Sequence, residues 1–369
     1  MNLVMYEIKK ISMRRIVITG LIILFIGIIY NFISSYLYYD TYILTEDKSK
    51  IEATNGKQAN EIRKNIENQF LGEVDEQTIG AIEQFLQKEE QNISHLSEDQ
   101  KKLYMLKYSN LSSLINTNMR EFDFGYCRGW QKFIINFSNT FSIFIIIYLV
   151  VIFYKIFICE KENEVEEIVY STKMARKYSV RTRIFIVNTL SFISYSTFYA
   201  INLLIHIILY GCDGAKVGIQ SIAIFSDLEY SLSVGEMTIF MFIEGMLATS
   251  AISMIICVCS CYGKNTFSIL LSSLIMILAP IFFDFSNVMP GIQKILVLLP
   301  TSSLSIVSQY KAGGLYCNSI MPVILSGAIS IGIILISLWY IKQYFRHYSL
   351  HRYCVRKHGK AICKYEIEK

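Results

Sequence analysis

Residues 133–157 read FIINFSNTFSIFIIIYLVVIFYKIF, and residues 159–183 read CEKENEVEEIVYSTKMARKYSVRTR. The first stretch is mostly apolar and holds more than the roughly 20 residues that a helix needs to cross the hydrocarbon core of a bilayer. The second stretch begins with five carboxylates and ends in a group of lysines and arginines. This alternation predicts a membrane-spanning helix that leads into a charged loop.

The apolar residues of the whole chain come in blocks of this kind. Six blocks are long enough to consider as spans: Ile16–Tyr36, Phe133–Phe157, Ile184–Tyr210, Met237–Cys259, Phe267–Phe285 and Ile320–Ile341. Of the 369 residues, 53% are hydrophobic and 18% are charged, which excludes an ordinary soluble protein. Backbone groups in lipid must be satisfied internally, so we expect helices. We predict an all-α polytopic membrane protein with six transmembrane helices.

The positions of lysine and arginine predict the orientation of these spans. Cations are frequent in the N-terminal tail, in the loop between spans 2 and 3 and after residue 342, whereas the short loops of opposite parity carry few. Cytoplasmic loops are enriched in Lys and Arg, so both termini should lie in the cytoplasm. The formal net charge of +5 is explained by this topology, and no nucleic-acid partner is needed.

The same pattern divides the chain into five parts. We expect a cytoplasmic interfacial helix at residues 1–15, a first span at 16–36, an extracytoplasmic helical domain at 37–132, a bundle of spans 2–6 at 133–341 and a basic cytoplasmic tail at 342–369 that contacts membrane lipids. Within the insertion, two helices are predicted, at Asp75–Glu90 and Ser97–Leu114. Asp75 is the expected N-cap of the first, and Ser97 with Gln100 forms a capping-box pattern for the second.

Motifs for catalysis, cofactors and metals are missing from the sequence. It has no phosphate-binding loop and no H-E-x-x-H pattern, so we expect neither an enzyme nor a cofactor. Its nine cysteines are scattered rather than gathered outside, which argues against structural disulfides. A tail site remains open as an alternative, with the possible ligands His347, His351, Cys354, His358 and Cys363, but surrounding cations oppose a metal there.

Three polar residues inside the predicted spans are candidates for a transport path. Glu244 lies in the fourth block, and a carboxylate there costs roughly 2.5–3.5 kcal/mol on insertion scales, so it should face the bundle interior. Asn202 and His206 lie in the third block, on a span with further Ser and Asn residues. Each of the three could instead be a packing residue that forms a hydrogen bond to a neighbouring helix.

Several segments resemble the membrane subunits of ABC-2-type transporters of Gram-positive bacteria. The loop from Glu160 to Arg176 is similar to the family pattern of acidic residues, an apolar pair and then Ser-Thr-Lys-x-x-Arg. Tyr6–Lys10 looks like the family's interfacial helix, and Gly218–Gln220 and Leu299–Thr301 resemble recurring elements. The resemblance implies that the loop, 159–183, forms a coupling helix for a separate ATPase, with the coupling residues Glu160, Glu162, Glu164, Glu166, Glu167, Ser171, Thr172, Lys173 and Arg176.

The resemblance further implies a location and a function. It predicts a multi-pass protein of the bacterial cytoplasmic membrane that exports a peptide, lipid-like or hydrophobic toxic compound. Its partners would be a cytoplasmic ABC ATPase subunit and a second permease, identical or related. Two alternatives stay open on the sequence alone. One is a membrane-anchored capture or immunity protein that uses residues 37–132, and the other is an ATP-independent channel or secondary transporter.

Overall fold

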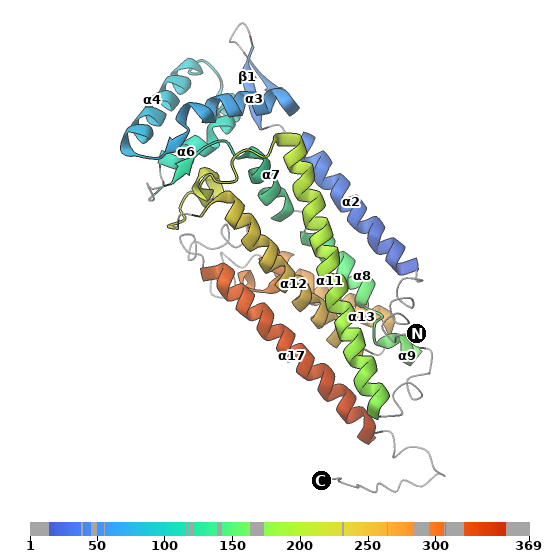
Figure 1. The fold of residues 1–369 in the computed structure, drawn as a ribbon. Coiled ribbons are helices and arrows are strands. Elements are labelled where there is room, and N and C mark those ends of the chain that lie inside the picture. The colour runs from blue at the N-terminus through green and yellow to red at the C-terminus, as the bar shows by residue number, and fades with distance from the viewer. Residues whose placement is uncertain are drawn as a thin grey trace, which may run out of the picture.

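The computed structural model describes residues 15–37, 40–45, 50–54, 56–115, 117, 122–138, 142–162, 173–230, 232–263, 265–282, 295–305, 307 and 321–351. Long helices form one body of the molecule, and a smaller domain of short helices and strands covers one end of it (Figure 1). The predicted interfacial helix at 1–15 lies outside these residues except for Arg15, as does the tail beyond His351.

Five helical segments in the described part of the chain are long and apolar enough to cross a membrane. The elements that hold them are α2 (Arg15–Leu37), α8 (Ser142–Phe153) with α9 (Ile158–Glu162), α11 (Lys173–Tyr210), α12 (Val234–Tyr262) and α17 (Met321–His351). They coincide with five of the six predicted blocks. The remaining block, Phe267–Phe285, contains α13 (Thr266–Phe282), whose apolar stretch Thr266–Ile277 is shorter than the other spans.

Two predicted spans have different boundaries from those expected. The second block, Phe133–Phe157, is not one helix: it is divided among α7 (Arg128–Asn136), α8 and a turn at 154–157 that leads into α9. The third span begins eleven residues before Ile184, because the basic half of the charged stretch continues directly into α11. The loop between α9 and α11 is therefore shorter than the predicted 159–183.

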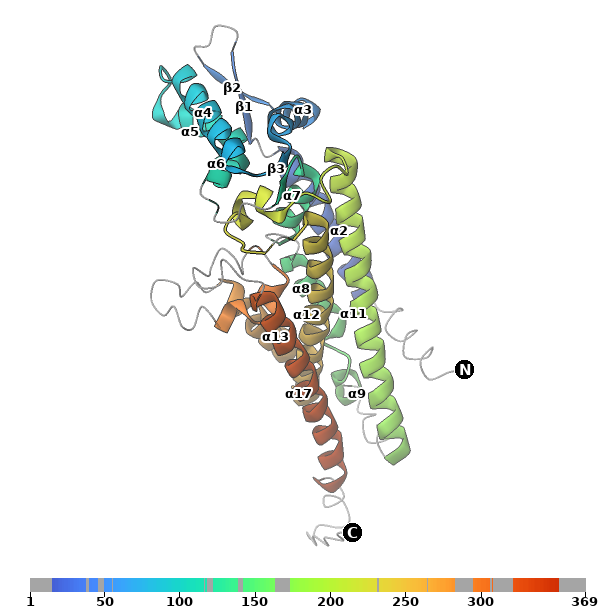
Figure 2. The same ribbon diagram turned by 60° about the vertical axis from the view of Figure 1, so that its left-hand side comes forward.

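Helix α12 lies at the centre of the bundle. It packs against α11, α17 and α8, and against the short helix α15 (Pro300–Ser303) (Figure 2). Its buried positions include small residues such as Gly245, Ala248 and Thr249. In lipid, the burial of apolar side chains gives little drive for helices to associate, so close packing has to hold them together. Small side chains allow the helices to approach closely.

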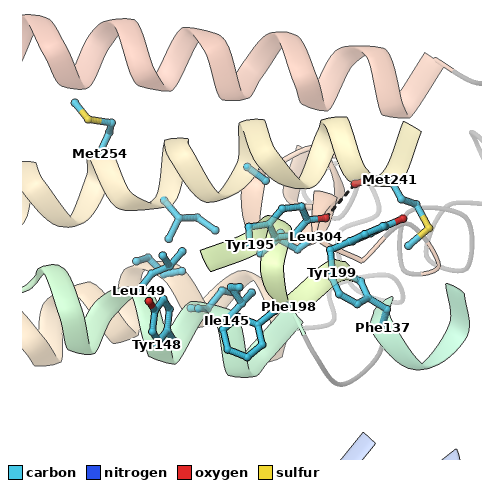
Figure 3. Packing of buried hydrophobic residues seen from close by; sticks show 14 of the residues in the cluster. Phe137, Ile145, Tyr148, Leu149, Tyr195, Phe198, Tyr199, Met241, Met254 and Leu304 are labelled. Atoms are coloured by element: carbon cyan, nitrogen blue, oxygen red, sulfur yellow. Dashed lines mark hydrogen bonds between the residues drawn. The ribbon is translucent and has the colours of Figure 1, made fainter. Parts of the chain in front are cut away.

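Tyrosines of α11 occupy the contact between α11 and α12. Tyr195 donates from its hydroxyl to the backbone oxygen of Met241 at 3.2 Å, and Tyr199 does the same to Thr238 at 2.6 Å. Figure 3 shows both rings next to α12, with the hydrogen bond from Tyr195 to Met241 drawn as a dashed line. A Cβ atom at Gly245 would overlap the Tyr195 ring, so the close approach of α11 to α12 depends on a glycine at this position.

The segment between α2 and α8 forms a domain with its own apolar core. We call it the outer domain, after the side of the membrane on which the sequence analysis expects it. It contains α3 (Gly56–Glu67), α4 (Glu76–Asn92), α5 (Glu98–Met105) and α6 (Ser109–Ile115). The domain is mostly helical, as expected, but it also contains strands that were not predicted: β1 (Thr41–Leu44) and β2 (Ile51–Thr54) form an antiparallel pair, and β3 (Gly72–Glu73) pairs with β4 (Asp123–Phe124). The first pair was missed because its two strands have only four residues each and lie in a polar stretch.

The predicted helix starts in this domain are confirmed. Asp75 accepts a hydrogen bond from the backbone N of Thr78, and Ser97 with Gln100 forms a complete capping box. The predicted helix Ser97–Leu114 is instead broken by a 3-10 turn, η2 (Leu106–Tyr108). This break turns Leu111 and Leu114 into the core, whereas Leu103 and Leu106 stay exposed.

We predict that Gly245→Ala lowers the free energy of unfolding by about 1–3 kcal/mol, since the added methyl overlaps the Tyr195 ring and forces α11 away from α12. Gly332→Ala on α17 is the matched control, because a Cβ there meets no atom within 4 Å. Thermal unfolding of both variants in detergent measures the difference. Equal effects of the two substitutions would contradict close packing at Gly245.

Candidate coupling site at the base of the charged loop

A buried ion pair joins the two ends of the charged loop. Arg183 of α11 donates from Nη1 to Glu160 Oε2 at 2.7 Å and from Nη2 to Oε1 at 2.5 Å. Both side chains are only 1% exposed. A guanidinium and a carboxylate that meet through two parallel bonds form a strong and directional contact. The pair therefore holds α9 against α11 across 23 positions of sequence.

Neighbouring groups fix the turn that precedes α9. The guanidinium of Arg183 also donates to the backbone oxygen of Ile156 at 3.2 Å, and its Cζ lies 5.6 Å from the centroid of the Phe157 ring. On α12, Ser260 Oγ accepts from the backbone N–H groups of Phe157 at 3.0 Å and of the next residue at 3.3 Å. The rings of Phe157 and Phe345 on α17 are 5.5 Å apart. Segments α9, α11, α12 and α17 thus meet at one point.

The predicted coupling residues fall into four groups. Glu160 is buried in the ion pair, so it does not lie on an exposed docking surface. Glu162 is exposed, with an oxygen 3.7 Å from Lys155 Nζ. Lys173 and Arg176 belong to the first turns of α11. The others, Glu164, Glu166, Glu167, Ser171 and Thr172, lie outside the described residues.

The charged stretch was expected to form one helix with acids first and cations last. In the described residues its two halves belong to different helices instead: the acids Glu160 and Glu162 end α9, and the cations from Lys173 begin α11. Cations at a helix N-terminus oppose the macrodipole by about 0.3–1 kcal/mol each at exposed sites. Arg183 could not be predicted as the partner of Glu160, because the pairing depends on how α9 packs on α11.

Helix α11 connects the charged loop to the outer domain without a break. Its 38 residues span about 57 Å at 1.5 Å per residue. Lys173 lies ten residues before Arg183, so the first turns of α11 extend beyond the ion pair, and both figures show α11 reaching past α9 (Figures 1 and 2). At the other end, Asn60 of α3 donates to the backbone oxygen of Leu209 at 3.3 Å.

A second charged cluster holds the outer domain to the bundle. Asp40 follows α2 and is surrounded by three cations: Arg128 Nη2 at 2.7 Å, Lys132 Nζ at 2.8 Å and Arg63 Nη2 at 3.8 Å from its carboxylate oxygens. Burial alone would raise the pKa of Asp40, but the three cations outweigh it and hold that pKa well below its usual range. The cluster ties α2, α3 and α7 together.

These four residues were not among the predicted site residues. One signal was present: Asp40 directly follows the first span, while Arg128 and Lys132 precede the second at a spacing that puts both on one face of a helix. The contribution of Arg63 carried no such signal, since it comes from the middle of α3.

Glu67 is the second acid of this outer junction. It is buried, and its Oε1 accepts from Asn110 Nδ2 at 3.1 Å, while Asn110 also exchanges hydrogen bonds with Gln131 at 3.0 and 3.2 Å. Burial raises the pKa of Glu67 to about 7, and Arg63 and the Asn110 hydrogen bond offset only part of that effect. This carboxyl therefore changes its charge near neutral pH.

The three candidate path residues do not form one site. Asn202 Oδ1 accepts from Asn31 Nδ2 of α2 at 2.7 Å, and Asn202 O lies 2.8 Å from His206 Nδ1. His206 Nε2 lies 3.4 Å from Asn136 Nδ2 of α7. Glu244 is buried on α12 and accepts instead from Ser326 Oγ of α17. These contacts match the packing interpretation of all three residues.

The described residues contain neither a disulfide nor a group of side chains that could bind a metal ion. Six cysteines there are free thiols, including Cys257, Cys259 and Cys261 at the end of α12. Among the same residues, His, Cys, Asp and Glu side chains do not gather in groups of three or more that could hold a metal ion. The possible tail ligands from Cys354 onward lie outside the description, as do the side chains of His347 and His351.

Comparisons with known proteins leave the family open. No family model matches the chain, no curated protein is similar to it, and no solved structure matches its fold.

Removing one partner of the Glu160–Arg183 ion pair should destabilise the fold. We predict that Glu160→Gln or Arg183→Met lowers the free energy of unfolding by about 3–5 kcal/mol, because the remaining charge stays buried without its counter-ion. Replacing both residues with Met should recover part of that loss. Thermal unfolding in detergent checks the prediction, with the exposed Glu162→Gln as control. If Glu160→Gln behaves like Glu162→Gln, the pair does not hold the loop.

The outer junction should respond to pH through Glu67. Its pKa in the folded protein, about 7, is above the ordinary value of 4.5, so the folded state binds the extra proton. Protonation of Glu67 therefore adds to the free energy of unfolding. This contribution, on the order of 3 kcal/mol, is fully present below pH 4.5 and is lost as pH rises through 7. Unfolding measured from pH 4.5 to 8 should show this fall. Glu67→Gln should remove the fall in the free energy of unfolding, whereas the control Glu73→Gln, at an exposed position, should keep it. If stability falls with pH as before in Glu67→Gln, Glu67 is not the titrating group.

Proposed function

We propose that this chain is the permease subunit of an ABC-2-type exporter, driven by a separate cytoplasmic ATPase. The observation that carries the proposal is the buried Glu160–Arg183 pair at the base of the charged loop. A force applied to the loop has to reach the spans through a rigid connection. A buried bidentate pair, braced by Ser260 and Phe345, is such a connection.

The long helix α11 supports the same proposal. An ATPase that moved the start of α11 would move one helix whose far end contacts the outer domain. There the backbone oxygen of Leu209 accepts from Asn60 of α3, and Asp213, just after α11, lies 2.6 Å from Lys64 of α3. The first turns of α11, from Lys173 to Arg176, lie beyond the ion pair and belong to the segment that would dock. Charged docking surfaces give selective and reversible association.

The remaining parts of the proposal concern the membrane location, the number of spans, the partner and the exported compound. Several apolar helices make this a multi-pass membrane protein. We place it in the bacterial cytoplasmic membrane with both termini inside, six spans with α13 as the fifth, and a second permease copy or paralogue as partner. The exported compound would be a peptide, a lipid-like molecule or a hydrophobic toxic compound.

One observation favours a second candidate, a membrane-anchored protein that captures an extracellular peptide. The outer domain has its own core, formed by residues such as Ile82, Leu111 and Phe124, and does not depend on the spans to bury its apolar side chains. A capture protein would need this domain and would not need the charged loop.

A co-purification experiment separates the two candidates. We expect the tagged chain, purified from its native host in mild detergent, to bring down a P-loop ATPase in stoichiometric amount, detected by mass spectrometry. Replacing Glu162, Glu164 and Arg176 together with Gln should reduce the ATPase to background, because the docking charges are lost while the buried pair stays intact.

The matched control removes three charges from the outer domain instead, with Glu83, Lys88 and Glu90 of α4 replaced by Gln. This control should retain the ATPase. A well-folded chain that recovers no ATPase would overturn the permease proposal. If the α4 variant lost the biological activity of the protein in its host while the loop variant kept it, the capture protein would be favoured.

A further inference from the structure

Two exposed cations lie near the start of α11. Lys177 and Arg181 are one helical turn apart, and neither forms an ion pair with another described residue. The two acids of α9 are paired with other cations instead. Two positive charges therefore remain on this surface for a partner of opposite charge.

Arg181 belongs to a stripe of α11 that faces lipid. The members of the stripe are spaced by three, four and seven residues, which places them on one face of a helix: Tyr178, Arg181, Phe185 and Phe192. The three aromatic side chains are 54%, 62% and 46% exposed, in a segment that is apolar enough to cross a membrane. Apolar side chains that are exposed on such a segment contact lipid, so the guanidinium of Arg181 lies on the same lipid-facing surface.

Aromatic rings mark the depth of Arg181 in the membrane. Beside the Glu160–Arg183 pair, a row of ring contacts runs through α17 to the end of α12, formed by Phe157, Phe345, Tyr344 and Tyr262. Tyrosine side chains gather at the level of the lipid headgroups, because one end of the ring is apolar and the other is polar. Arg181 precedes Arg183 by two residues, which is about 3 Å along the helix, so it lies at headgroup depth.

A lipid phosphate fits this position in both chemistry and distance. A guanidinium binds a phosphate through two parallel hydrogen bonds, and an ammonium adds a point charge. One helical turn, about 6 Å, separates Arg181 from Phe185. The headgroup region on each side of the hydrocarbon core is about 5–8 Å thick. A lipid whose chains pack on Phe185 and Phe192 therefore carries its phosphate to Arg181.

We propose that Lys177 and Arg181 bind the phosphate of an anionic phospholipid whose acyl chains lie along Phe185 and Phe192. An anionic lipid is favoured over a zwitterionic one, because the ammonium of a choline headgroup would be repelled by the two cations. The proposal requires only that α11 lies in a membrane and does not depend on transport or on an ATPase. It places the start of α11 against the headgroup layer, at the base of the charged loop.

Lipid binding to the purified full chain tests the proposal. The protein is kept in detergent, without any ATPase, and is titrated with phosphatidylglycerol or with phosphatidylcholine, and bound lipid is counted by native mass spectrometry. We expect tighter binding of phosphatidylglycerol. Lys177→Gln and Arg181→Gln should each weaken it about five-fold, and the double variant about 30-fold, with little effect on phosphatidylcholine. Equal affinity for the two lipids, or unchanged binding in the double variant, would overturn the proposal.

Three controls make the assignment specific. Lys57→Gln combined with Lys88→Gln removes two exposed cations from the outer domain and should leave lipid binding unchanged. An equal loss in this control would show an effect of net charge alone. Arg181→Lys keeps the charge and should retain most of the affinity, and thermal unfolding verifies that all variants are folded. Inorganic phosphate should not displace the lipid, and displacement at equal concentration would show a site for free phosphate instead.

A second assay distinguishes the headgroup from a protein partner. The Lys177→Gln, Arg181→Gln variant is purified from the native host under the conditions of the co-purification experiment. If it loses an ATPase that the wild type retains, while its affinity for phosphatidylglycerol is unchanged, the two cations belong to a protein-docking surface and the lipid proposal is wrong. If the wild type recovers no ATPase, the permease proposal fails, but the lipid titration still decides the present one.

Discussion

The buried contact between Glu160 and Arg183 is the constraint on which the end of the bundle beside the charged loop depends. Each charge would be very costly in that position alone, so α9 and α11 are held at the distance at which the two groups satisfy each other. The turn before α9 is fixed in the same place, because the arginine binds Ile156 and the serine of α12 binds the two following N–H groups. Helix α11 therefore leaves the charged loop in a defined direction.

Between the two ends of the bundle, several helix contacts are hydrogen bonds between uncharged groups. Tyrosine hydroxyls of α11 bind backbone oxygens of α12, and an asparagine of α2 binds an asparagine of α11. Such contacts suit a bundle in lipid, where apolar side chains gain little by leaving one hydrocarbon environment for another. Among the described residues, the ion pairs of the bundle lie near its two ends: the Glu160–Arg183 pair beside the charged loop and the Asp40 cluster beside the outer domain.

These two charged junctions differ in what they allow. The inner pair has one acid and one base in a closed bidentate contact. The outer junction places three cations around Asp40, with a second acid, Glu67, whose pKa is near neutrality. Because α11 connects both ends, a change at either junction acts on the same rigid helix. That geometry is the physical basis of the proposed coupling between loop and outer domain.

Much of the fold could be predicted from the sequence, because the bilayer and the helix caps act locally. Apolar blocks longer than 20 residues located five long helices, and Asp75 and Ser97 marked two helix starts in the outer domain. The strands Thr41–Leu44 and Ile51–Thr54 were not predicted, since their pairing depends on the domain around them. The sequence by itself also placed the charged loop between two spans. Only the tertiary structure decided which of its charges are exposed, because burial of Glu160 depends on an arginine 23 positions away that packing brings to it.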